Sequence, residues 1–325
     1  METWDATEKR AAEADGTPSG RRGSRRPRLT GPWPARPPGG PRPDSAGKDG
    51  KDGKDGVARM VAVARMAGLV RILRTARAVG VVRMAGVAAL AAMVAAQIAT
   101  GLRPHDLRLT TVVVVLLAVS ALAFAAAAYG PGRAAGAFAA AVATGFAAEW
   151  AGIRTGLPFG DYRYTDALWP RPGGVPLIVA LAWGGMGLAA HAVARRVAPR
   201  GRVIAILAGA LALTAWDLFL DPQMLRLGLW VWAEPGPYRG VPLGNFAGWL
   251  LVSLLVMTLV DRLTGRTDGG RAEATGLVAL YTVMAAMETV GFAVVFRPPD
   301  PFVAAAGGLA MGTFALLAWG RAWRR

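Results

Sequence analysis

Two aspartates, Asp217 and Asp221, stand four residues apart in the stretch WDLFLDPQ, which closes an apolar run long enough to cross a membrane. On a helix this spacing places both side chains on one face. A carboxylate at membrane depth is disfavoured by roughly 2.5–3.5 kcal/mol on insertion scales, so such groups usually face a cavity or a partner. Two acids this close in an apolar shell cannot both ionise cheaply, and one is expected to keep its proton near neutral pH. We interpret the pair as a proton donor in a dry, aromatic-lined pocket.

Further polar residues are expected at the same level of the membrane. Glu149 ends the third apolar segment, Asp161 lies in the loop after it, and Asn245 begins the sixth segment. Glu288 lies near the end of the seventh. Odd-numbered segments end on one side of a membrane, so these groups can reach one layer with the aspartate pair. We take the acids as candidate catalytic residues.

Each of these residues also has a structural interpretation. Glu149 could pair with Arg154 or Arg163, and Asp161 follows a glycine, which is ordinary turn chemistry.

Asp221 precedes Pro222 and could simply end its helix. Asn245 could cap the following helix. Glu288 has no cationic neighbour in the sequence, so a purely structural role explains it less well.

Aromatic side chains gather in the same segments and loops. They could form an interfacial belt, or a wall for a long hydrophobic substrate whose rings stabilise a transient cation by about 0.5–2 kcal/mol each. The belt leaves the acids unexplained. As substrate-binding candidates, together with Asn245, we take Tyr162, Tyr164, Trp183, Trp216, Trp230, Trp232 and Trp249.

Composition predicts an all-α, polytopic membrane helix bundle. Of the 325 residues, 54% are hydrophobic and 18% are charged, whereas a soluble domain carries about a quarter charged residues. We expect seven or eight transmembrane helices of about 20 residues each. The expected spans are 84–101, 110–129, 134–151, 174–194, 202–222, 243–260, 272–296 and 301–319.

The segments before the bundle carry much of the positive charge. Residues 1–56, rich in Pro, Gly and Arg, are expected to be a disordered basic tail, and 57–83 a basic linker that could be amphipathic. The transmembrane domain is expected over 84–325. The net charge of +16 is therefore no sign of nucleic-acid binding. Without cysteine and with two histidines, the chain offers no thiolate or histidine-built metal site.

Basic connections follow the even-numbered segments, whereas the other loops mix arginines with acids. The positive-inside bias then places both termini in the cytoplasm and the acid layer on the extracytoplasmic side of the cell membrane. The basic connections contain Arg133; Arg195, Arg196, Arg200 and Arg202; Arg262, Arg266 and Arg271; and Arg321, Arg324 and Arg325.

An ordered set of motifs resembles the CruF-type carotenoid biosynthesis membrane proteins, over about residues 85–325. The motifs are E-W-x-G-x-x-T-G-x-P-F-G-x-Y-x-Y (149–164), V-P-L-I (175–178) followed by Trp183, W-D-x-x-x-D-P (216–222), W-x-W (230–232) and V-P-x-x-N-F-x-G-W (241–249). This family includes carotenoid 1,2-hydratases and bisanhydrobacterioruberin hydratases.

The resemblance implies addition of water to the C1–C2 double bond of an acyclic ψ end group, with no cofactor and no metal. Such an alkene must be protonated at C2 to give a tertiary cation at C1, which requires a desolvated acid and a positioned water. Asp217 or Asp221 would be the acid, and Glu149, Asp161 or Glu288 would orient or deprotonate the water. The expected partners are a ψ-ended carotenoid, the bilayer and other pathway enzymes, such as a glycosyltransferase.

Other functions remain open at this point. The buried acids could serve a proton-coupled or lipid transporter, although no convincing repeat is visible. A scaffold or a prenyl transferase of the same pathway is also possible, but prenyl transfer would favour an Asp-rich D-D-x-x-D motif, and WDLFLDP is sparser.

Overall fold

The computed structural model describes residues 49–104, 106–265 and 274–320. The chain divides into two units, Met1–Ala62 and Val63–Arg325, and the described part of the first unit is the beginning of helix α1. A disordered tail was expected over residues 1–56. Residues 1–48 of it lie outside the described residues, and α1 begins at Asp49. The linker and the expected boundaries stay predictions. Arg266, Arg271, Arg321, Arg324 and Arg325 of the topology argument also lie outside the described residues.

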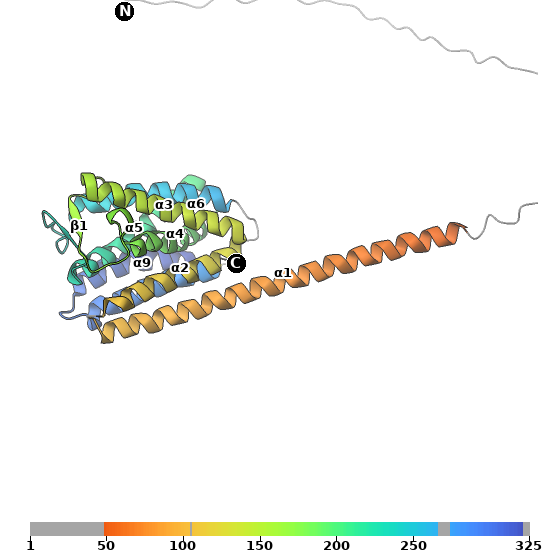
Figure 1. The fold of residues 1–325 in the computed structure, drawn as a ribbon, viewed down its shortest axis with the longest axis horizontal. Coiled ribbons are helices and arrows are strands. Elements are labelled where there is room, and N and C mark those ends of the chain that lie inside the picture. The colour runs from red at the N-terminus through yellow and green to blue at the C-terminus, as the bar shows by residue number, and fades with distance from the viewer. Residues whose placement is uncertain (1–48, 105, 266–273, 321–325) are drawn as a thin grey trace, which may run out of the picture. The chain divides into compact units, whose positions relative to one another are not determined.

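The expected helical membrane architecture is confirmed: eight helices of the described chain are long and apolar enough to cross a membrane. The first apolar stretch, Val63–Leu102, is longer than the predicted 84–101. In chain order the helices are α1 (Asp49–Leu102), α2 (Leu107–Tyr129), α3 (Pro131–Thr155), α4 (Leu177–Val197), α5 (Arg202–Arg226), α6 (Leu243–Thr264), α8 (Thr275–Val290), which continues as the π-helical turn η2 (Gly291–Val295), and α9 (Pro301–Gly320) (Figure 1).

Helix α4 is the central helix and contacts α2, α3, α5, α6, α8 and α9. Its WGGMG segment allows this packing because glycine lets neighbouring helices approach closely. A Cβ added to Gly184 would lie 2.7 Å from the Phe138 and Val142 side chains of α3, and one added to Gly185 would lie 2.9 Å from Leu117 of α2. These glycines therefore allow α2 and α3 to pack closely against α4.

The Asp221-Pro222 sequence suggested that helix α5 ends at Pro222, but it does not. It runs through the proline to Arg226. Asp221 therefore lies inside a helix, where the i, i+4 relation to Asp217 holds.

Four helix connections lie at one end of the bundle: α1–α2, α3–α4, α5–α6 and α8–α9 (Figure 1). The α3–α4 connection contains strand β1 (Tyr162–Tyr164) and a 3₁₀ turn, η1 (Pro172–Gly174). The α5–α6 connection contains strand β2 (Trp230–Trp232), which pairs antiparallel with β1. This two-stranded ribbon joins the ends of α3 and α5, which carry the candidate acids.

The opposite end of the bundle contains an ion cluster around the buried Asp261 of α6. Its carboxylate lies 2.7 Å from Nε of Arg202 and 3.5 Å from Nε2 of His191. These contacts join α4, α5 and α6 away from the candidate acids.

Candidate active site

Asp217 and Asp221 are both buried and share one hydrogen-bond donor. Their exposed fractions are 0% and 3%. The side-chain amide of Asn245, in the first turn of α6, donates to Oδ2 of Asp217 (2.8 Å) and to Oδ2 of Asp221. The capping role considered for Asn245 was wrong, because Pro242 precedes α6 and no side chain caps it. The asparagine instead joins the two acids from a second helix.

Glu149 is a second buried carboxylate, and three donors surround it. The hydroxyls of Tyr162 and Tyr164 donate to Oε2, the latter over 2.7 Å, and the indole N–H of Trp183 donates to Oε1 over 3.2 Å. The expected pairing with Arg154 is absent, since that guanidinium donates to the carbonyl oxygens of Trp150 and Gly173. Glu149 is thus an oriented acceptor held by neutral donors.

The two tyrosines reach Glu149 because of the ribbon. In the β1–β2 pairing Tyr162 lies opposite Trp232 and Tyr164 opposite Trp230. Burial and the Glu149 carboxylate both raise the pKa of the Tyr162 and Tyr164 hydroxyls, so both remain protonated donors. We predicted these residues as substrate contacts; the alternation in YRY and WVW is the signal that could have revealed the strands.

Several of the candidate aromatic side chains pack together in the interior. Trp183 and Trp249 stack with ring centroids 4.1 Å apart, and Trp216 meets Trp249 edge-on at 6.2 Å. Trp232 is buried, and its indole N–H donates to the carbonyl oxygen of Phe159. By contrast, Trp169 is 81% exposed, as a residue of an interfacial belt would be.

Two adjoining cavities lie between these groups. The first has about 20 Å³, close to the space one water molecule needs. We call it the acid chamber; its polar lining is Glu149, Asp221, Asn245, Tyr162 and Tyr164. The second, of about 40 Å³, is bounded by Trp183, Trp216, Trp230 and Trp249, and we call it the tryptophan cavity. Trp230, Trp249, Leu220 and Val179 line both, so a hydrocarbon end and a water can lie side by side.

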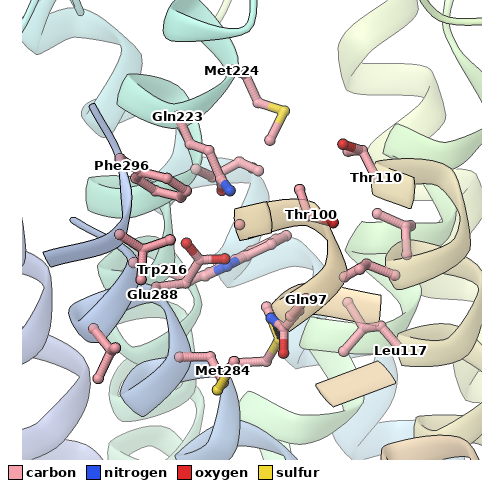
Figure 2. Close-up of a pocket in the computed structure, with 18 residues that line it drawn as sticks. Gln97, Thr100, Thr110, Leu117, Trp216, Gln223, Met224, Met284, Glu288 and Phe296 are labelled. Atoms are coloured by element: carbon pink, nitrogen blue, oxygen red, sulfur yellow. Dashed lines mark hydrogen bonds between the residues drawn. The ribbon is translucent and has the colours of Figure 1, made fainter. Parts of the chain in front are cut away.

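The other two candidate acids are elsewhere. Asp161 is exposed, and its backbone carbonyl accepts a hydrogen bond from the N–H of Ala233. Glu288 is buried but lines a third cavity, of about 100 Å³ (Figure 2). The single polar layer expected from the sequence therefore divides into the acid chamber and a separate cavity around Glu288.

In the described part of the chain, no three histidine, cysteine or acidic side chains are grouped as a metal site requires.

Comparison with known proteins indicates the metabolic pathway to which this protein belongs. A family model described as "Carotenoid biosynthesis protein" matches residues 110–314. The chain is also 32% identical over 120 residues to the bisanhydrobacterioruberin hydratase of Haloarcula japonica, a match that covers 35% of this chain and 40% of that protein. No solved structure matches the chain. This multi-pass membrane protein belongs to the carotenoid biosynthesis protein family and has a role in carotenoid biosynthesis.

Proposed function

We propose that the protein is a carotenoid 1,2-hydratase, which adds water across the C1–C2 double bond of an acyclic ψ end group. The observation that carries the proposal is the contact between the tryptophan cavity and the acid chamber. The first fits an uncharged branched alkene, and the second fits one water beside a proton donor. The hydratase name of the Haloarcula japonica relative supports the same reaction class.

The end group would lie in the tryptophan cavity. Protonation at C2 leaves a positive charge on the tertiary carbon C1. Indole faces attract such a charge by up to about 2 kcal/mol when it is desolvated, and Trp183, Trp216 and Trp249 surround the position with few competing dipoles.

The acid would be the Asp217–Asp221 pair. Both carboxyl groups contact one amide in a dry interior, so a single proton shared between them relieves their repulsion. Asp221 is the member that lines the acid chamber, and we assign it the transfer of this proton to C2. Asp217 would tune Asp221 without touching the substrate.

The attacking water would occupy the acid chamber. Glu149, fixed by its three donors, would accept a hydrogen bond from this water. This bond would orient a lone pair of the water oxygen toward C1. As the C1–O bond forms, one water proton leaves to the Asp221 carboxylate of the chamber and restores the protonated aspartate pair. The balance is one water consumed, one C–H and one C–O bond formed, and no redox change.

The test is the pigment profile of a lycopene-producing or γ-carotene-producing host that expresses the chain. The wild type should yield a tertiary alcohol that is heavier than its precursor by one water. Asp221→Asn should lower product formation by about 10²–10⁴-fold, because proton transfer by a placed side chain contributes that much. Asp217→Asn should lower it too, because Asp221 then loses the carboxyl group that shares its proton. Asp161→Asn, which changes an exposed carboxylate, is the matched control and should retain activity. Full activity in both buried variants, with the protein present in the membrane, would disprove the assignment.

A further inference from the structure

The cavity around Glu288 lies between α1, α2, α5 and α8, and the proposed reaction does not use it. Figure 2 shows Gln97 and Thr100, Thr110 and Leu117, Trp216 and Gln223, and Glu288 and Phe296 arranged around one space. Most of its wall is apolar, with contributions from valine, leucine and methionine side chains. It can therefore hold a hydrocarbon chain.

Two polar atoms on this wall are buried without a hydrogen-bond partner among the described residues: Nε1 of Trp216 and Oε1 of Gln97. The carboxyl group of Glu288 lies on the same wall. Glu288 is 7% exposed and Trp216 is 3% exposed. Unpaired buried polar groups are costly and rare in native proteins, and those that occur point to a bound water or ligand.

The cavity lies between the tryptophan cavity and the outside of the bundle. Trp216, Leu220 and Met224 line both cavities. At the other side its lining includes Val290 and Val295, which are 50% and 37% exposed on a membrane-spanning helix. A molecule that passes between the lipid and the tryptophan cavity can therefore pass Glu288.

We propose that this cavity is an alcohol-binding site, which holds the hydroxyl group of an isoprenoid tertiary alcohol. One hydroxyl can accept a hydrogen bond from Trp216 and donate one to Glu288 or to Oε1 of Gln97, while its hydrocarbon chain contacts the apolar wall. A hydrocarbon end group can form a hydrogen bond with none of these groups. The identification of this alcohol as the product on its way to the lipid rests on the proposed hydratase function.

The probe is dihydromyrcenol, an isoprenoid tertiary alcohol, compared with citronellene, the alkene from which it differs by one water. Binding is measured on the purified full chain in detergent through the ligand-dependent rise in unfolding temperature. The protein carries Asp221→Asn, so that neither probe is converted. The alcohol should bind about tenfold more tightly than the alkene, because the alkene leaves the buried N–H of Trp216 and Oε1 of Gln97 without a partner, and an unpaired buried group costs about that factor.

Glu288→Leu and Gln97→Leu should each reduce this preference, whereas Met287→Leu, an apolar change in the same wall, should leave it intact. If Glu288→Leu does not fold, Gln97→Leu alone tests the preference for the alcohol. Glu288→Gln, which keeps a hydrogen-bonding side chain, should then retain part of this preference. Equal affinity for the two probes, or a preference that survives Gln97→Leu and Glu288→Leu, would show that water alone fills the site. The preference does not depend on catalysis, so its loss and a missing hydroxylated pigment are independent outcomes.

Discussion

At the scale of single residues, Asn245 determines whether the two aspartates can act together. Its one amide group has two N–H donors, and the structure uses them for Asp217 and Asp221. A side chain without donors would remove the hydrogen bond that each of these two buried carboxyl groups accepts from the amide. The loss of such a bond at a buried polar group costs about 1–3 kcal/mol.

We therefore expect Asn245→Leu to lower the unfolding temperature in detergent and to abolish the hydrated pigment. Ser253→Ala is the matched control: Ser253 lies on the same helix and is buried, and its hydroxyl has no partner among the described residues. This control should retain both properties. If Asn245→Leu behaved like Ser253→Ala, the amide bridge would have no role in stability or in turnover.

At the scale of elements, α3 and α4 must pack closely enough to bring Trp183 to Glu149. This approach depends on Gly145, because a Cβ at that position would lie 2.3 Å from Cγ of the Trp183 ring. The ring is 1% exposed and stacks on Trp249, so it has no room to move.

Gly145→Ala should destabilise the protein by about 1–3 kcal/mol, as overpacking of a core does, and should reduce hydration by displacing Trp183. Gly136→Ala lies on the same helix, where an added Cβ meets nothing within 4 Å, and should be neutral or slightly stabilising. Thermal unfolding and pigment analysis of the two variants measure the difference. Equal behaviour would mean that α3 can shift away from Trp183 at no cost.

The helices were predictable because apolar length and the i, i+4 spacing of Asp217 and Asp221 are local properties of the sequence. The contacts between elements were not. The Tyr162–Trp232 pairing joins residues 70 positions apart, and Asn245 reaches Asp217 from another helix. The proline rule failed at Pro222 because the surrounding bundle holds α5 in its helical form, which a local signal does not record.

At the scale of the whole molecule, the two ends of the bundle differ in chemistry. One end carries the ribbon and the acid chamber, and the other carries the Asp261 cluster and the basic α4–α5 connection, where Arg200 is exposed. We propose, from the positive-inside bias, that the Arg200 end faces the cytoplasm and the acid chamber faces the extracytoplasmic side. The hydrated end group would then form in the outer half of the membrane.

The chain contains no cysteine, so single cysteines report the orientation without background. Ala167→Cys places a thiol in the exposed α3–α4 connection, and Arg200→Cys places one in the α4–α5 connection. On intact cells a membrane-impermeant maleimide should label the cysteine at position 167 and not the one at 200, and permeabilised cells should label both. The opposite pattern on intact cells would reverse the orientation and place the acid chamber in the cytoplasmic half, because the two positions lie at opposite ends of α4.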